Sequence, residues 1–198
     1  MKLLLTAFEP FGGSDMNPAQ DAVRLVPARI GDIDIVKTDV PVVFGDAIRA
    51  VSAAILREKP DAVLCIGQAG GRAALTPERV AINVDDASIP DNAGAQPNDR
   101  PVVPGGPAAY FSTLPVKAMV AAIRQAGLPA SLSNTAGTFV CNHLMYGLLH
   151  LLATEYPGVR GGFMHVPFAP QQVIDRPAPS MSVEDIARGI IAAVAAMK

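Results

Sequence analysis

The residues best suited to chemistry in this sequence lie in the stretch from Thr135 to His143, which reads TAGTFVCNH. Residues 130–133 before it have the pattern of a short strand, which we predict there. After it, leucines recur at helical spacing at positions 144, 148, 149 and 152. The pattern therefore places Cys141 in the first turn of a helix that follows a strand.

That position would make Cys141 a candidate nucleophile. Gly137 permits a tight turn, and Thr138 is predicted as the N-cap, whose hydroxyl accepts from a free N–H. The helix dipole and the free N–H groups of the first turn favour negative charge, so we predict a lowered thiol pKa and a site for an oxyanion. The alternative is that Cys141 is a small buried apolar residue, as most lone cysteines are.

A thiol nucleophile needs a base, and the chain has three histidines. His143 follows Cys141 by two residues, which directs it around the helix and away from the thiol, and His150 lies about 180° away at 100° per residue. His165 ends a predicted strand at 162–166, and the ends of parallel strands gather at one edge of a sheet. Geometry therefore favours His165 as the base.

An acidic group normally orients such a base by accepting its second N–H. The candidates are Glu78, Asp85, Asp86 and Asp91. We rank Glu78 first because it opens a predicted strand after a glycine-rich loop. The alternative is a surface carboxylate paired with Arg79 or Arg72.

The rest of the chain supplies alternating strands and helices. Strands are predicted over 2–7, 33–40, 62–66 and 162–166, and helices over 44–59, 115–126 and 182–197, with a further helix beginning at Asn17-Pro18. A strand is predicted over 78–84 and no element over 85–114. This alternation predicts a single α/β domain over 1–198, a three-layer α/β/α sandwich with an open, mostly parallel twisted sheet.

Two glycine-rich loops follow predicted strands, at 8–14 and 67–72. Ligands of open parallel sheets bind at this edge, so Phe8 and Phe11 could form an apolar wall and Gln68 could offer a donor and an acceptor. The alternatives are phenylalanines that fasten the loop to the core and a glutamine that faces solvent.

Composition and charge narrow the functional classes. The net charge of -2 gives no reason to expect nucleic acid or a membrane as a partner. The two cysteines have no metal-ligand spacing and no disulfide pattern, which indicates the cytosol. The N-terminal apolar run is cut short by Glu9 and Pro10, which favours a strand over a signal peptide, and the last apolar run is too short to cross a bilayer.

Several long motifs, in order from end to end, resemble the pyroglutamyl peptidase type I family, also called pyrrolidone-carboxylate peptidases. They are TAFEPFGG at 6–13 with Asn17-Pro18, GQAGGR at 67–72, PERVAIN at 77–83, IPDN at 89–92, GPAAYF at 106–111, SNTAGTFVCN at 133–142 and HVP at 165–167.

The resemblance implies a cytosolic cysteine peptidase that removes an N-terminal 5-oxoproline from peptides through a thioacyl-enzyme. The family's triad falls on Glu78, Cys141 and His165. Its substrate-binding positions correspond here to Phe8, Phe11, Gln68, Phe139 and Val140. The resemblance further implies no metal or cofactor and a homotetramer, or in some members a dimer.

One position departs from the family pattern. Many relatives carry an arginine where this chain has Ser88. If that arginine assists the oxyanion or its loop, a neighbour such as Arg79 must replace it, or catalysis is weaker. The rival functions are a binding protein with a buried Cys141, a nucleoside phosphorylase, which would need an arginine-rich phosphate pocket, and a redox cysteine, which would need a resolving thiol.

Overall fold

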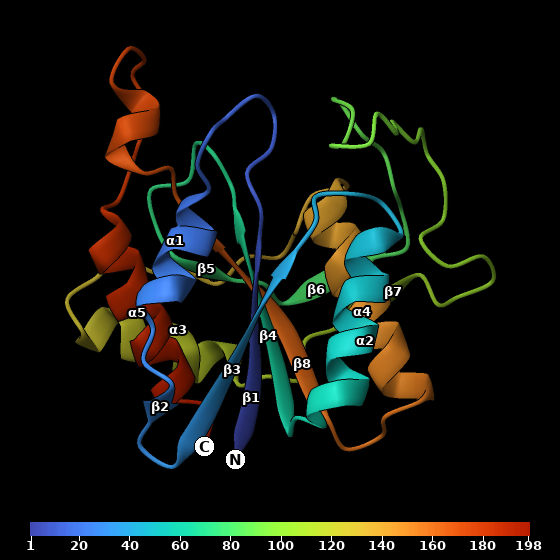
Figure 1. The fold of residues 1–198 in the computed structure, drawn as a ribbon, viewed down its shortest axis with the longest axis horizontal. Helices are drawn as coiled ribbons and strands as arrows, with labels where there is room; N and C mark the ends of the chain where they lie inside the picture. The colour runs from blue at the N-terminus through green and yellow to red at the C-terminus, as the bar shows by residue number, and fades with distance from the viewer.

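A six-stranded sheet in the order β2-β3-β1-β4-β8-β5 forms the centre of the computed structural model, which describes residues 1–198 (Figure 1). Its strands are β1 (Lys2–Phe8), β2 (Arg29–Ile30), β3 (Ile33–Val40), β4 (Ala62–Gln68), β5 (Thr76–Pro77) and β8 (Arg160–Val166). The four inner strands are parallel, and the short edge strands β2 and β5 are antiparallel to their neighbours. The predicted mostly parallel sheet is confirmed.

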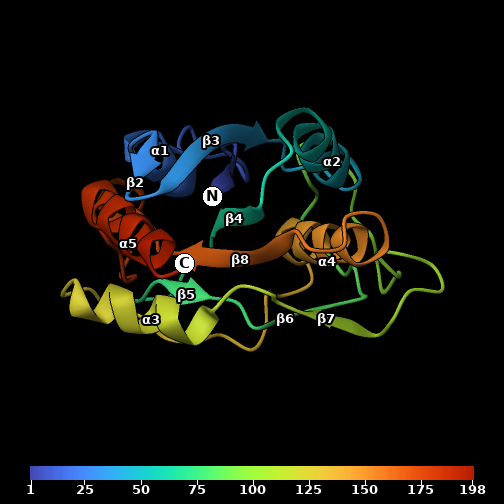
Figure 2. The ribbon, with the colours of Figure 1, turned by 90° about the horizontal axis from the view of Figure 1, so that it is seen from below.

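Helices cover both faces of this sheet, which gives the three layers expected from the sequence. The helices are α1 (Pro18–Leu25), α2 (Asp46–Glu58), α3 (Val116–Gln125), α4 (Val140–Thr154) and α5 (Val183–Ala195). On one face α5 packs against α1 and α3, and on the other α2 packs against α4 (Figure 2). Asn17 and Ser182 cap α1 and α5 with their side chains, at the two helix starts predicted from the sequence.

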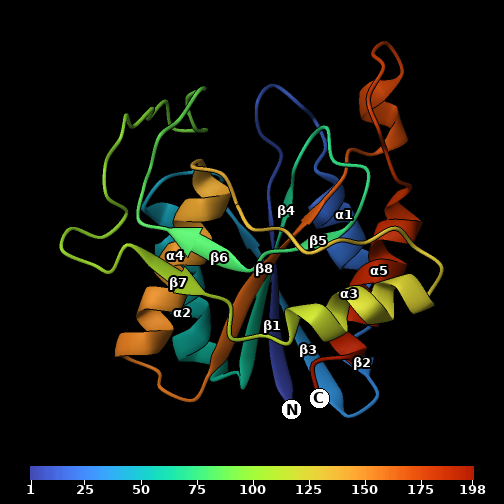
Figure 3. The same cartoon turned by 180° about the vertical axis from the view of Figure 1, so that it is seen from behind.

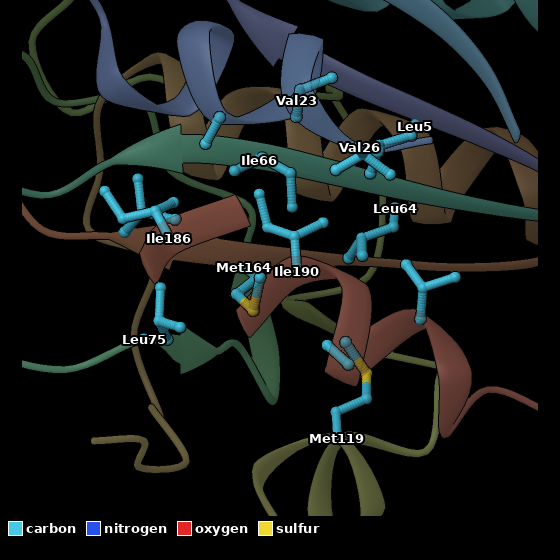
Figure 4. Close-up of a cluster of buried hydrophobic side chains, with 14 of the residues drawn as sticks. Leu5, Val23, Val26, Leu64, Ile66, Leu75, Met119, Met164, Ile186 and Ile190 are labelled. Atoms are coloured by element: carbon cyan, nitrogen blue, oxygen red, sulfur yellow. The ribbon is translucent and has the colours of Figure 1, made fainter. Parts of the chain in front are cut away.

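The alternation of side chains along each strand divides the core into two clusters. Leu5, Ile66 and Met164 point toward α1, α3 and α5, in the cluster that Figure 4 shows in part. Leu4 and Phe163 point toward α2 and α4. Since His165 lies two residues beyond Phe163 on β8, its side chain is on the α4 side of the sheet.

The prediction of one strand over 78–84 is wrong. The chain forms β5 before Glu78 and a separate short strand, β6 (Val80–Ile82), after it. β6 pairs with β7 (Ala109–Phe111), which lies within the segment predicted to have no element. This two-stranded sheet packs against α4 (Figure 3), and no local pattern in 85–114 indicated that contact.

Three smaller differences also arise from long-range contacts or turn geometry. Residues 130–133 make only two isolated bridges, to Leu75 and Glu78 on either side of the edge strand β5, so no strand forms there. β2 was not predicted. Helix α2 begins at Asp46 and not at Phe44, because Gly45 takes a left-handed φ of 77° as its N-cap.

The carboxyl ends of the parallel strands lie at one edge of the sheet, opposite the two termini (Figure 1). The β1–α1 loop, the β4–β5 loop and the 3₁₀ segment η1 (Pro170–Val173) extend from this edge. No helix of the structure has the length and apolar character needed to span a membrane.

Candidate active site

Helix α4 begins with an uncapped first turn that carries Cys141. Its N-cap is Phe139, an extended residue whose side chain accepts no hydrogen bond. The prediction of Thr138 as N-cap is wrong, because the Thr138 hydroxyl donates to the carbonyl oxygen of Asp86 at 2.7 Å. The N–H groups of the first turn therefore have no side-chain acceptor and remain available to a ligand oxygen.

The Cys141 thiol lies against the end of strand β4. A Cβ atom on Gly67 would stand 3.0 Å from Cys141 Sγ and 2.7 Å from Cζ of Phe163, so only glycine leaves room for the sulfur. Gly67 is also the register partner of His165 on β8. Neighbouring strands lie about 4.8 Å apart. Cys141, on α4, and His165, on β8, are therefore both neighbours of Gly67.

His165 is held by Glu78 in the protein interior. Glu78 follows the edge strand β5, and its N–H donates to the carbonyl oxygen of Phe163 at 2.9 Å. Its Oε1 is 2.7 Å from His165 Nδ1, and the two residues are 0% and 2% exposed. An ionised carboxylate can only accept, so Nδ1 carries the proton and Nε2 is left as the basic nitrogen of the neutral ring. No hydrogen bond joins this imidazole to the Cys141 thiol in the structure.

Arg72 is the second partner of the Glu78 carboxylate. Its Nη1 donates to Glu78 Oε1 at 2.6 Å, and its Nη2 donates to the carbonyl oxygen of Thr135 at 3.0 Å. The ion pair with Arg72 that the sequence suggested as an alternative therefore forms, but the Glu78 carboxylate in it is buried and not on the surface. Glu78 Oε2 has no hydrogen-bond partner. A buried carboxylate is costly without such partners, so the hydrogen bonds from Arg72 and His165 offset part of the cost of burying Glu78.

Burial controls the protonation of the thiol and the imidazole. It raises the pKa of the Cys141 thiol to about 12, with the Glu78 carboxylate adding to the rise and Arg72 opposing it. The predicted lowering of this pKa is wrong, because loss of water on burial disfavours the thiolate. Burial also lowers the pKa of His165, although Glu78 opposes that shift. At neutral pH the pair is therefore a thiol beside a neutral imidazole.

The other two histidines make contacts elsewhere. His143 Nδ1 is 2.7 Å from Oδ2 of Asp85, and its Nε2 accepts from the Gly45 N–H at 2.8 Å. His150 Nδ1 is 3.0 Å from the Tyr110 hydroxyl. Both ring nitrogens of His143 are thus occupied, and His150 lies at the β7 side of α4.

A cavity of about 690 Å³ opens among the loops at the carboxyl edge of the sheet. Phe11 and Gln68, two of the five expected substrate-binding residues, line it. Phe139 packs on Phe11 with ring centroids 6.3 Å apart. Phe8 and Val140 are buried beneath, 2% and 0% exposed, and do not line the cavity.

Sequence reasoning missed the side of this cavity that follows β8. Phe168, Gln172 and Arg176 line it, together with Ser88. Arg79, offered as a substitute for the arginine expected at Ser88, is not among the lining residues. Local sequence gave no signal for Arg176, because its segment is irregular and lies outside the motifs. Nowhere do three or more His, Cys, Asp or Glu side chains gather as a metal-binding group.

Comparisons with known proteins agree over the whole chain. A family model described as pyroglutamyl peptidase matches residues 1–198. The chain is 58% identical to a pyrrolidone-carboxylate peptidase from Levilactobacillus brevis, covering 100% of this chain and 97% of that protein. It is also 58% identical to one from Streptomyces coelicolor, covering 98% and 91%.

Solved structures show the same fold. The pyroglutamyl peptidase I of Bacillus amyloliquefaciens matches with a TM-score of 0.96 and 46% identity, over 99% of this chain and 96% of that one. A mutant pyrrolidone carboxyl peptidase from the hyperthermophile Pyrococcus furiosus matches with a TM-score of 0.94 and 42% identity, over 100% and 98%.

Proposed function

Because the chain belongs to the pyroglutamyl peptidase family, a family of cysteine peptidases, we propose that it removes the N-terminal pyroglutamyl residue from peptides with Cys141 as nucleophile, His165 as base and Glu78 as the group that orients the base. The observation that carries this assignment is the buried 2.7 Å contact between Glu78 Oε1 and His165 Nδ1. His165 is the strand partner of Gly67, and the Cys141 sulfur lies against that glycine.

The first step forms a thioester. Cys141 Sγ attacks the carbonyl carbon of the pyroglutamyl residue while its proton passes to His165 Nε2. The oxyanion is stabilised by the free N–H groups of the first turn of α4, including that of Cys141. His165 then gives the proton to the nitrogen of the departing peptide, and the C–N bond breaks.

Water completes the cycle. His165 Nε2 takes a proton from a water molecule while the oxygen of that water attacks the thioester carbon. The C–S bond then breaks, and His165 returns the proton to the sulfur. 5-Oxoproline leaves as the acid. Each passage through an imidazolium is stabilised by the adjacent Glu78 carboxylate, which also holds the ring in place.

The charge distribution suits a substrate without an α-ammonium group. Arg176 is the only ionisable residue that lines the cavity at the carboxyl edge, and its charge is positive. The Glu78 carboxylate is buried and already paired with Arg72 and His165. An ordinary amino terminus would find no free carboxylate there, whereas a neutral lactam needs only an apolar wall and a few polar partners, for which Phe11 and Gln68 are suited.

The same proposal extends to the organisation of the protein. We propose a single catalytic domain over 1–198, which acts in the cytoplasm as a homotetramer or dimer and uses only its own side chains for the steps above. The match of the family model to the full range 1–198 supports the single domain. The family resemblance supports the assembly and the compartment.

A matched pair of substrates tests the activity. We expect the protein to release a fluorescent amine from its pyroglutamyl amide and to leave the corresponding prolyl amide intact. The two substrates differ in the ring carbonyl and in the charge of the ring nitrogen, so the comparison isolates recognition of the lactam. A folded and reduced protein that hydrolyses neither substrate would contradict the proposal and favour a binding protein.

Replacing Glu78 with glutamine tests the base and its orientation. We expect kcat/KM to fall about a hundredfold or more, because the imidazolium loses its counter-charge. Glu78 raises the pKa of His165, so its loss should lower that pKa further. Since kcat/KM requires neutral His165, the acidic limb of its pH profile should move to lower pH. Glu184→Gln, at an exposed position of α5, is the control. An acidic limb that stays in place or moves to higher pH would contradict the assignment.

A further inference from the structure

The cavity at the carboxyl edge contains a single cation that is held by neighbouring residues and has no acidic partner. Arg176 follows η1, and the centre of its guanidinium lies 4.3 Å from the centroid of the Phe168 ring. Its Nε donates to the carbonyl oxygen of Gln172 at 3.1 Å. Neither terminal nitrogen of the guanidinium makes a hydrogen bond, and no carboxylate is within ion-pair distance.

The surroundings fix the place of this guanidinium. The Phe168 ring packs directly against Gly70, where a Cβ would stand 2.0 Å from the ring. The β4–β5 loop therefore contacts the ring and limits its movement. Gln172 Nε2 donates to Gln68 Oε1 at 3.0 Å and reaches Ser14 Oγ at 3.4 Å. These contacts join the segment after β8 to the two glycine-rich loops. Arg176 therefore stacks on the Phe168 ring, and its two terminal nitrogens, Nη1 and Nη2, remain free to donate to a ligand.

The cavity is also larger than a five-membered lactam requires. Phe11 and Gln68 are suited to the ring, and the volume of about 690 Å³ that they share with Arg176 leaves room for groups beyond it. A pyroglutamyl residue is uncharged, so it offers the guanidinium no counter-charge. In a peptide substrate the groups that can supply one lie after the scissile bond, on the leaving side.

We propose that Arg176 binds a carboxylate of the leaving peptide and so makes the enzyme prefer pyroglutamyl peptides with an anionic group close after the scissile bond. This inference rests on the proposed peptidase function. Two free N–H donors of a guanidinium match the two oxygens of a carboxylate. The carboxylate can belong to an acidic side chain or to the carboxyl terminus of a very short peptide.

Pairs of substrates that differ only in charge test this specificity. Pyroglutamyl dipeptide and tripeptide amides ending in glutamate or glutamine measure the side-chain preference, and pyroglutamyl-alanine against its amide measures the terminal one. In the wild type we expect kcat/KM for the anionic member of a pair to exceed that of its neutral partner about tenfold. Because Arg176 is exposed, added salt should reduce this ratio.

Variants assign the preference to Arg176. The ratio should fall to near one in Arg176→Gln and below one in Arg176→Glu, while Arg188→Gln should keep the wild-type ratio, because Arg188 is on α5 and paired with Asp185. The pair of substrates that responds identifies which carboxylate is bound. Ratios that are equal in the wild type and both Arg176 variants would overturn the inference alone. Failure of the wild type to cleave any pyroglutamyl substrate would overturn the proposed function and this inference with it.

Discussion

Replacing Cys141 with alanine is expected to lower kcat/KM for a pyroglutamyl amide by about four orders of magnitude or more. The variant keeps the uncapped first turn of α4 and the contact between Glu78 and His165, but it has no atom that can form the thioester. Residual turnover would come only from binding and from the oxyanion site. The measurement is amine release from the pyroglutamyl amide, with folding checked by circular dichroism.

Cys65 supplies the matched control for this variant. It is fully buried on β4, on the side facing α2 and α4, and its thiol takes no part in the proposed chemistry. Cys65→Ala should keep turnover and cost about 1 kcal/mol of stability through the lost packing. Equal losses of turnover in Cys141→Ala and Cys65→Ala would show that the effect comes from the fold and not from a nucleophile.

The raised pKa of Cys141 adds a chemical signature to the same experiment. Since this thiol has a pKa of about 12, its rate of alkylation by iodoacetamide should continue to rise with pH above 9, and it should be slow at neutral pH. A rate that reaches a plateau below pH 7 would instead indicate a thiolate stabilised in the resting enzyme. The buried Cys65 should remain unmodified in the folded protein.

Replacing His165 with alanine should have the second largest effect, a fall in kcat/KM of about a thousandfold or more. The variant loses the only imidazole beside Cys141 and leaves the Glu78 carboxylate with Arg72 as its remaining partner. Added imidazole should restore part of the activity by occupying the vacated space. The measurement is kcat/KM with and without imidazole, at a pH where imidazole is neutral.

His150 is the suitable histidine for comparison. His150→Ala removes a contact with the Tyr110 hydroxyl and should keep most of the turnover. His143→Ala should also keep most of the turnover per folded molecule, but it leaves the buried Asp85 without its partner and should lower the free energy of unfolding by about 3 kcal/mol. Near-normal rates in His165→Ala would remove this residue from the mechanism.

Much of the fold followed from local patterns in the sequence. Apolar runs predicted the inner strands β1, β4 and β8, because a parallel strand covered on both faces excludes polar residues along most of its length. The inner strand β3 instead alternates buried and more exposed residues. Asn17-Pro18 predicted the start of α1, since a capping side chain and a fixed φ act within a few residues. These features depend on residues close in sequence, and sequence periodicity reports them directly.

The short pairings did not follow from such patterns. Strands β5, β6 and β7 have only two or three residues each, and their backbone partners lie far away in the chain. Residues 130–133 had the pattern of a strand but found only bridge partners at the sheet edge. Such short strands form where the rest of the fold leaves backbone N–H and C=O groups unpaired, and the strand propensity of a few residues cannot predict where that is.

The functional residues divide in the same way. The sequence by itself indicated a cysteine at the start of a helix, a histidine at the end of a buried strand and a first-ranked carboxylate, Glu78, just after a glycine-rich loop, because residue type and spacing are local properties of the chain. Only the tertiary structure decided the rest. The pKa of Cys141 depends on burial, and burial is a property of the assembled core. The contact of Glu78 with His165 and the placement of Arg176 beside the two glycine-rich loops join segments that lie far apart in the chain and meet only in the folded protein.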